Sequence, residues 1–249
     1  MRTRIFLAGL AAAGLFSGVF SRNLLPSLSA QGGPTIYHNG WIDLNKNGKK
    51  DPYEDPSLPV SKRIDDLLSR MTLEEKTCQL ATLYGFGKVL KDKMPNEKWF
   101  GRVWKDGIAN IDQQFDGRPH TEYDLPASKH AEAINTIQRW FIEKTRLGIP
   151  VDFTNEGIHG LHARGATCFP QECGLGATWD EDLVYRIGAV TAREARALGY
   201  TNVYAPILDM ARDPRWGRVE ENYGESPYHA SRLGVAMVKG LQENGVVST

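Results

Sequence analysis

The chain has 249 residues, of which 41% are hydrophobic and 24% are charged. A chain of this size and composition can bury one sizeable core, which predicts one large domain or two small ones. Lysine plus arginine and aspartate plus glutamate are equal at 30 each. This balance argues against a surface that binds polyanions, so we expect neither nucleic acid nor an anionic membrane as a partner.

The N-terminus has the features of an export signal. Arg2 and Arg4 form a basic start, and residues 5–20 are apolar and rich in Ala, Gly and Leu. This stretch has the length of a signal peptide and is short for a membrane span. We predict a signal peptide over residues 1–30, cleaved after Ala30, and a periplasmic or extracellular protein that leaves the membrane after cleavage. An uncleaved membrane anchor is the alternative.

An N-terminal extension over residues 31–58 contains a calcium-loop pattern. Oxygen-bearing side chains occupy five of the positions that this loop requires, a glycine occupies the sharp turn, and one backbone carbonyl completes the set. The predicted ligands are Asp43, Asn45, Asn47, Lys49 through its carbonyl, Asp51 and Glu54. The strand-like Trp41-Ile42 and the interrupting Pro52 argue against a helix-loop-helix hand. Structural calcium and a metal-free polar turn are the two interpretations.

Residues 59–249 form the main domain, which begins with helical patterns. Thr72-Leu-Glu-Glu75 is a capping box that predicts a helix through Gln79. The preceding helix is predicted from apolar residues at helical spacing, namely Val60, Ile64, Leu67, Leu68 and Met71. A short strand is predicted over residues 107–111.

Helices and strands alternate in the rest of the chain. The predicted helices span residues 126–147, 180–198 and 227–244, and the predicted strands span residues 149–153, 203–208 and 246–249. The helix ends are indicated by Gly148, Gly199 and Gly245, and the start of the last helix by Ser226-Pro227. Such alternation predicts parallel strands with helices outside.

A doubly wound open sheet and a closed barrel are both compatible with this alternation. The nucleotide-binding open sheet needs a glycine-rich turn between a strand and a helix, and Gly174-Leu-Gly176 is only a fragment of one. Polar clusters instead follow two successive strands, within residues 154–159 and 209–218. Residues beyond the carboxyl ends of barrel strands form active sites. We therefore predict an α/β fold, the N-terminal portion of an incomplete (β/α)8 barrel.

The two polar clusters suit a sugar ligand. Glu156 can accept hydrogen bonds from vicinal hydroxyls, and His159 can donate one or brace the loop; a capped turn without ligand is the alternative. The segment 209–218 holds two carboxylates, three guanidinium groups and an indole. Within it, Asp209 and Arg218 are candidate ligand contacts. An internal salt-bridge network is predicted for Arg212, Asp213 and Arg215, and a solvated acidic face for Glu220, Glu221 and Glu225.

Cysteines give an ambiguous signal. Cys168 and Cys173 are five residues apart and can bridge in an oxidising compartment, or they can remain free thiols. Cys78 stands alone, and no spacing of Cys and His resembles a zinc site.

Several motifs occur in the order typical of one enzyme family. They are Arg63-Ile-Asp-Asp-Leu-Leu-Ser-Arg-Met-Thr-Leu-Glu-Glu-Lys76, Ile149-Pro-Val, Glu156-Gly-Ile-His159-Gly160, Ala166-Thr-Cys-Phe-Pro-Gln171, Gly176-Ala-Thr-Trp-Asp180, Ala205-Pro-Ile-Leu-Asp209, Arg212-Asp-Pro-Arg-Trp-Gly-Arg218 and Tyr223-Gly-Glu-Ser-Pro227. From Val60 to Thr249, the chain resembles glycoside hydrolase family 3, the β-glucosidase and β-xylosidase group. The resemblance implies exo-acting hydrolysis of terminal β-D-glycosidic bonds with retention, on a β-linked oligosaccharide or glycoside, without a catalytic cofactor.

The resemblance also implies a division of roles. Glu156 stands where the family binds hydroxyls of the terminal sugar, and Arg218 stands where the family's arginine contacts the same sugar. The family's nucleophile and acid/base, which retention requires, are expected beyond Thr249. We therefore expect a partial domain that is inactive alone on chromogenic β-glucosides. A non-catalytic exported module that binds carbohydrate or calcium is the alternative, and an N-acetylglucosaminide-cleaving relative fits less well.

Overall fold

The computed structural model describes residues 35–84, 94–97, 104–113 and 121–249. The predicted signal peptide lies outside these residues. Within the described part, none of the helices combines the length and the apolar character that a bilayer span requires.

A five-stranded parallel sheet forms the centre of the described structure. Its strands are β3 (Thr82–Tyr84), β4 (Asn110–Asp112), β5 (Asp152–Glu156), β6 (Asn202–Tyr204) and β7 (Val247–Ser248). Each strand pairs in parallel with the next one along the chain, in the order β3-β4-β5-β6-β7. A doubly wound sheet reverses its strand order at a switch point, whereas a barrel adds strands sequentially. The sequential order therefore confirms the predicted barrel portion.

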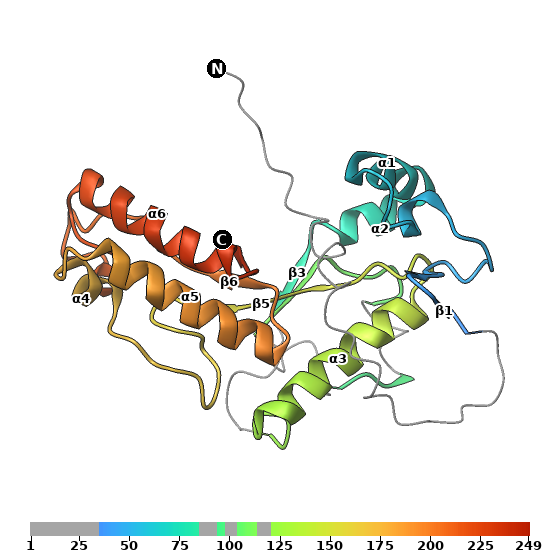
Figure 1. Ribbon diagram of the computed structural model, residues 1–249, viewed down its shortest axis with the longest axis horizontal. Coiled ribbons are helices and arrows are strands. Elements are labelled where there is room, and N and C mark those ends of the chain that lie inside the picture. The colour runs from blue at the N-terminus through green and yellow to red at the C-terminus, as the bar shows by residue number, and fades with distance from the viewer. Residues whose placement is uncertain (1–34, 85–93, 98–103, 114–120) are drawn as a thin grey trace.

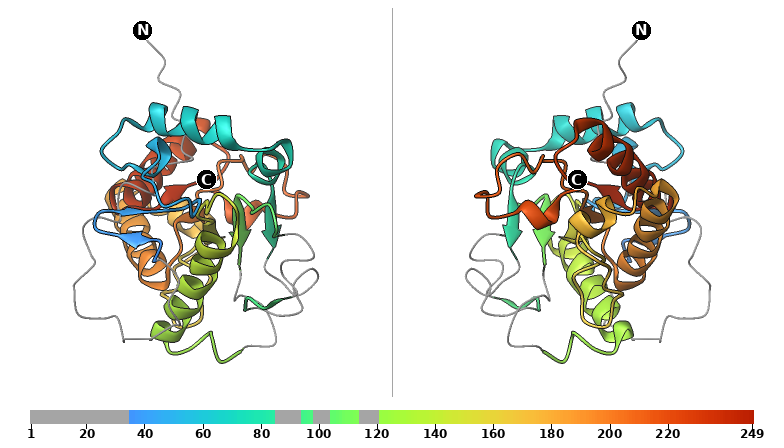
Figure 2. Two further views of the ribbon diagram at one scale, coloured as in Figure 1. Left: turned by 90° about the vertical axis from the view of Figure 1, so that its right-hand side faces the viewer. Right: turned by 90° about the vertical axis from the view of Figure 1, so that its left-hand side faces the viewer.

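Helices connect and cover these strands (Figures 1 and 2). They are α1 (Val60–Arg70), α2 (Leu73–Cys78), α3 (Ala127–Lys144), α4 (Glu172–Gly176), α5 (Glu181–Leu198) and α6 (Pro227–Glu243), with short 3-10 helices η3 (Pro52–Glu54) and η5 (Val219–Glu221). A hairpin of β1 (Tyr37–His38) and β2 (Trp41–Ile42) precedes them. The predicted capping box at Thr72 and the predicted Gly199 and Ser226 caps are all present.

The main core lies between the sheet and helices α3, α5 and α6. Its most deeply buried large side chains include Trp104, Ile111, Phe141, Phe153, Tyr200, Met237 and Leu241. Helices α5 and α6 approach closely because each has a glycine at the crossing. A Cβ on Gly188 would lie 2.8 Å from the Met237 carbonyl oxygen, and one on Gly240 would lie 2.3 Å from the Tyr185 carbonyl oxygen. This close packing holds the two helices as one layer.

Proline residues shift the predicted strand boundaries. The strand predicted over residues 149–153 lies at 152–156, and the strand predicted over 203–208 ends at Tyr204. Pro150 and Pro206 flank these strands and have no backbone N–H to donate to the sheet. The strand predicted at 107–111 lies at 110–112, a shift that no proline explains. As a consequence, Glu156 is the last residue of β5 and does not belong to a loop.

Helix α3 ends at Lys144, three residues before the predicted end, because Thr145 has an extended backbone and caps the helix. The predicted helix-ending glycine, Gly148, has a different role. Its φ is +57°, and a Cβ there would lie 2.5 Å from the Leu44 carbonyl oxygen. Glycine is thus required for the N-terminal extension to approach the chain just before β5.

The N-terminal extension and α1 share a second small core at the amino end of the sheet. Tyr53, Leu67, Met71 and Leu147 are buried together there. Arg146 ties the segment before β5 to both helices, because it donates to Glu75 Oε1 of α2 at 2.9 Å and to the carbonyl oxygen of Arg70, the last residue of α1, at 2.8 Å. In Figure 1, α1 and α2 lie on the opposite side from α4.

The calcium-loop pattern folds as a compact turn whose oxygens accept hydrogen bonds from the loop itself. Asp43 accepts from the backbone N–H of Asn47 at 3.0 Å and of Gly48 at 2.8 Å. Glu54 accepts from the N–H groups of residues 44, 45 and 51. Within the described ranges no group of three Asp, Glu, His or Cys side chains is arranged to hold a metal. A strand precedes the loop and a 3-10 helix ends it, so it is not a helix-loop-helix hand.

Calcium binding at this loop stays a prediction, which calorimetry can test. The chain would be treated with a chelator and titrated with calcium, and binding would release or absorb heat with a matching rise in Tm. Absence of any binding heat at millimolar calcium would establish the metal-free turn.

Glu54 is predicted to be important for stability with or without metal. Its side chain is 4% exposed and accepts three backbone hydrogen bonds. Glu54→Ala leaves those N–H groups without a partner, which we expect to cost about 2–3 kcal/mol of unfolding free energy. Urea denaturation would measure the loss. The control Glu132→Ala changes an exposed residue of α3 and should stay within about 0.5 kcal/mol of wild type.

Candidate functional site

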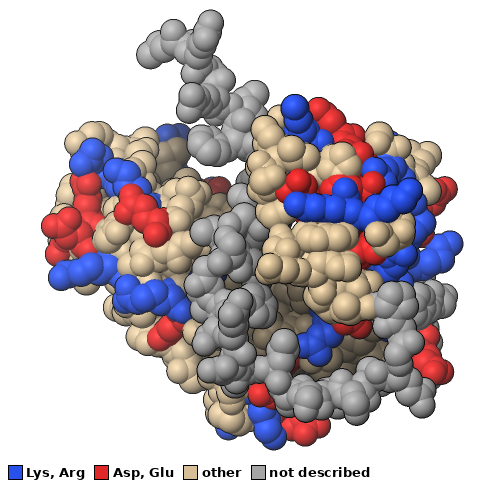
Figure 3. All heavy atoms as spheres, turned by 45° about the vertical axis from the view of Figure 1, so that its right-hand side comes forward, with Lys and Arg blue, Asp and Glu red and all other residues tan. Residues whose placement is uncertain are grey.

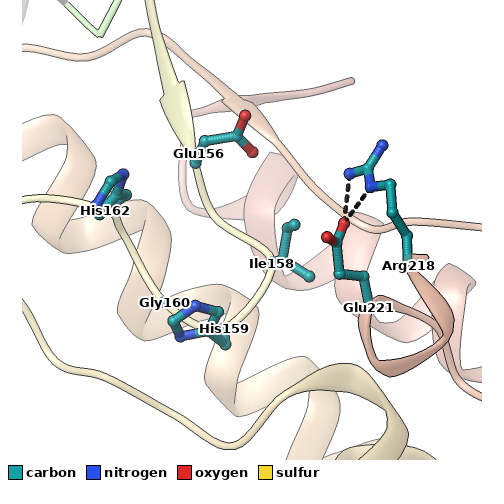
Figure 4. A pocket seen from close by; sticks show the side chains of 7 residues that line it. All are labelled: Glu156, Ile158, His159, Gly160, His162, Arg218 and Glu221. Carbon is teal, nitrogen blue, oxygen red and sulfur yellow. Dashed lines mark hydrogen bonds and ion pairs between the residues drawn. The ribbon is translucent and has the colours of Figure 1, made fainter. Parts of the chain in front are cut away.

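A hollow lies beyond the carboxyl end of β5, beside the segment that follows β6 (Figure 4). Because β5 and β6 are parallel neighbours, the residues after both strands reach the same edge of the sheet. The hollow is lined by Glu156, Ile158, His159, Gly160, His162, Arg218 and Glu221. It therefore contains three of the four predicted sugar contacts.

Glu156 forms one wall of the hollow. It is the last residue of β5 and is half-buried, and its Oε1 accepts from Gln113 Nε2 at 3.3 Å. Burial raises the pKa of the Glu156 carboxyl, and the positive charges of Arg218 and His162 partly oppose this rise. Among the described residues, Gln113 is the one donor to this carboxylate and its bond is long, so the carboxylate can accept further hydrogen bonds from a ligand.

The turn after Glu156 depends on two glycines. A Cβ on Gly157 would lie 2.0 Å from Val203 Cγ1, inside the neighbouring strand. Gly160 has a φ of +102°, and a Cβ there would lie 2.1 Å from the Thr167 carbonyl oxygen. These contacts force the chain to turn sharply, which brings His159 to the hollow.

Arg218 lies opposite Glu156. Figure 4 shows its guanidinium across the hollow from the Glu156 carboxylate and paired with Glu221. The Arg218 Nε donates to Glu221 Oε2 at 2.7 Å, and this bond is the main cause of the raised pKa of Arg218. The arginine side chain remains 53% exposed. Glu221 therefore fixes the orientation of the Arg218 guanidinium, while most of its N–H donors stay accessible to a ligand.

Asp209 differs in position from the other predicted contacts. It is exposed and does not line the hollow, although its charge contributes to the raised pKa of Arg218. The predicted salt-bridge network nearby forms only in part. Arg215 Nε donates to Asp213 Oδ1 at 2.9 Å, whereas Arg212 reaches the Met210 sulfur at 3.7 Å in place of a carboxylate.

The cysteines are free thiols in this structure. The proposed bridge between Cys168 and Cys173 is therefore not formed. Cys168 instead lies beside the hollow, with its sulfur 3.4 Å from His159 Nδ1. His159 thus both lines the hollow and contacts the following loop, so both predicted roles remain compatible with its position.

Three residues at the site were not predicted as contacts. Gln113 follows β4 and reaches Glu156 across the sheet, and His162 lines the hollow from the loop after β5. Glu221 was assigned to a solvated acidic face, but its side chain is only 20% exposed because it pairs with Arg218. The spacing Arg218-x-x-Glu221 is a signal for this pair, since residues three apart meet on one helical turn. No local signal relates Gln113 to Glu156, because 43 residues separate them.

Charged side chains of both signs occur on one face of the described structure. Lysine, arginine, aspartate and glutamate side chains are interspersed over the face shown in Figure 3. That face carries no single-sign patch of the kind that binds polyanions.

Comparisons with known proteins identify the class to which this barrel belongs. The sequence profile of the glycosyl hydrolase family 3 N terminal domain matches residues 72–249. A putative β-xylosidase of Formosa agariphila is 35% identical over 77% of this chain and 25% of its own length. A periplasmic β-glucosidase/β-xylosidase of Dickeya chrysanthemi is 31% identical over 93% of this chain and 37% of its own length.

Solved structures agree. A β-glucosidase from Erythrobacter marinus superimposes with a TM-score of 0.67 at 30% identity, over 79% of this chain and 26% of that one. The laminaribiose complex of a Listeria innocua β-glucosidase variant gives a TM-score of 0.59 at 28% identity, over 75% of this chain and 26% of that one. The chain belongs to glycosyl hydrolase family 3, and it spans only 25% and 37% of the length of the Formosa agariphila and Dickeya chrysanthemi relatives.

Glu156 is predicted to reduce stability at neutral pH. Burial raises the pKa of the Glu156 carboxyl in the folded state, so the folded chain binds this proton more tightly than the unfolded chain does. The free energy of unfolding that comes from this group is therefore complete at low pH and is lost as pH rises through the folded pKa. Glu156→Gln should therefore have a Tm at pH 7 at or above that of wild type, with the difference vanishing toward pH 4. Scanning fluorimetry across this range would measure it. The exposed control Glu132→Gln should show no such trend, and a clearly lower Tm for Glu156→Gln at pH 7 would contradict the prediction.

Proposed function

We propose that this chain supplies the binding subsite for the terminal sugar of an exported β-glycosidase. The observation that carries the proposal is the position of Glu156 and Arg218 on facing walls of one hollow at the carboxyl edge of the sheet. A carboxylate accepts from two adjacent hydroxyls, and a guanidinium donates to a third oxygen in a fixed plane. Together the carboxylate and the guanidinium complement the hydroxyl groups around a pyranose ring.

The substrate proposed is a β-linked oligosaccharide or glycoside, cleaved from its non-reducing end with retention. The relatives are named β-glucosidases and β-xylosidases, and the Listeria innocua enzyme has been solved with laminaribiose and with glucose. Retention requires two carboxyl groups about 5 Å apart on either side of the scissile bond. We assign sugar binding, not bond cleavage, to Glu156, Arg218, His159 and Asp209. The nucleophile and the acid/base are proposed to belong to the part of the enzyme that these 249 residues do not include.

The organisation proposed for the chain follows from this role. Residues 1–30 are a signal peptide, residues 31–58 an extension that packs on α1, and residues 59–249 the partial barrel domain. Export is supported by the relatives from Dickeya chrysanthemi and Salmonella typhimurium, both named periplasmic. No cofactor is proposed for catalysis, since the family chemistry uses carboxyl groups.

Glucose binding by matched arginine variants tests the proposed function. Arg218→Met removes the guanidinium that faces Glu156 and should weaken glucose binding by about tenfold or more, the worth of one charge-assisted hydrogen bond. Arg215→Met is the control, because Arg215 is exposed, pairs with Asp213 and lies outside the hollow. Its affinity should match wild type.

Titration of the 249-residue chain followed by NMR would give these dissociation constants. Equal weakening by Arg218→Met and Arg215→Met, or no glucose binding by the wild-type chain, would contradict the proposal.

A further inference from the structure

Glu172 is a fully buried carboxyl group that the proposed sugar contacts do not use. It is the first residue of α4, its side chain is 0% exposed, and its Oε1 accepts from the Ile207 backbone N–H at 3.2 Å. A charged side chain is rarely buried in this way without a specific function. Its partners therefore indicate what it does.

The second partner is Tyr223, whose hydroxyl is buried beside this carboxyl. After burial, the charge of Glu172 contributes to the raised pKa of Tyr223. By geometry, neither the Tyr223 hydroxyl nor Glu172 Oε2 has a hydrogen-bond partner among the described residues, so two unsatisfied polar atoms are buried here. The backbone of Tyr223 also lies against α4, because a Cβ on Gly176 would lie 2.3 Å from the Tyr223 carbonyl oxygen.

Ile207 and Tyr223 are the two ends of one segment. Residues 208–222 between them form the loop that carries Asp209 and Arg218, and the short η5 is its only helical turn. Residues 212–215, in the middle of the loop, are all exposed. The exposed middle of the loop has little packing of its own, so its geometry depends on the parts of the loop on either side of it.

We propose that Glu172 is a positioning residue that joins both ends of the 208–222 loop and so sets the place of Arg218 in the sugar subsite. The role in binding rests on the proposed function, whereas the effect on the loop does not. The neutral form of the acid suits this task, because its carbonyl oxygen can accept from the Ile207 N–H while its O–H can donate to the Tyr223 hydroxyl.

The surroundings of Glu172 keep it in this neutral form. The pKa of Glu172 is raised to about 9, mainly by burial and partly by the negative charge of Glu221, against the opposing effects of the Ile207 N–H and Tyr223. From α6, the titratable neighbour is His229, whose Nε2 lies 2.8 Å from the Gly176 carbonyl oxygen. In the unfolded chain, the Glu172 carboxyl ionises near its ordinary pKa of 4.5. Stability from this group is therefore complete below pH 4.5 and is lost as pH rises toward 9.

Three variants of the 249-residue chain separate positioning from simple packing. Glu172→Gln preserves shape and one acceptor, Glu172→Ala removes both contacts, and Glu220→Gln is an exposed control in the same loop. Hydrogen exchange followed by mass spectrometry would report on residues 208–222. We expect at least tenfold faster exchange in Glu172→Ala, with wild-type rates in Glu220→Gln and nearly wild-type rates in Glu172→Gln.

Two further readouts complete the test. The fall in Tm between pH 5 and pH 9 should be smaller in Glu172→Gln than in wild type, and glucose affinity should fall at least fivefold in Glu172→Ala but less than twofold in Glu172→Gln. Unchanged exchange in a folded Glu172→Ala would overturn the inference. If Glu172→Ala does not fold, a pH dependence of Glu172→Gln identical to wild type would overturn it. Altered exchange with no glucose binding by wild type would instead overturn the proposed function and leave the positioning role standing.

Discussion

The parallel pairing of β5 with β6 is the constraint on which the site depends. Parallel strands end at the same edge, so the residues after Glu156 and those after Tyr204 must meet there. The crossover between the two strands contains α4 and α5, and α5 packs closely against α6. The hollow between Glu156 and Arg218 is a consequence of this register and of the glycine turn after β5.

The site is built at some expense to stability. Glu156 is half-buried and accepts a long hydrogen bond from Gln113, and Glu172 is fully buried, so the folded state raises the pKa of both carboxyl groups. A core made only for stability would contain apolar side chains at these places. Sites that bind ligands retain such groups because a ligand or a loop needs the polar atom. The amino end of the sheet shows the opposite pattern, since Tyr53, Leu67, Met71 and Leu147 form an apolar core there.

Local signals in the sequence predicted what depends on neighbours in the chain. The capping box at Thr72, the glycine end of α5 at Gly199 and the Ser226 cap of α6 were predicted and are confirmed, because each motif is complete within a few residues. The ends of helices and strands that depend on distant contacts could not be predicted in this way. Gly148 indicates a helix end by its type, but its conformation serves contact with Leu44, about a hundred residues earlier.

The sequence by itself determined the family, the barrel class, and Glu156 and Arg218 as the residues to examine, since ordered motifs and strand-helix alternation are written along the chain. Only the tertiary structure decided which of the predicted residues share the hollow. It brought Gln113 and Glu221 to the site, left Asp209 outside the lining and placed Glu172 beneath the loop. The physical reason is that these relations depend on strand register and on burial, and both arise from residues that are far apart in the chain.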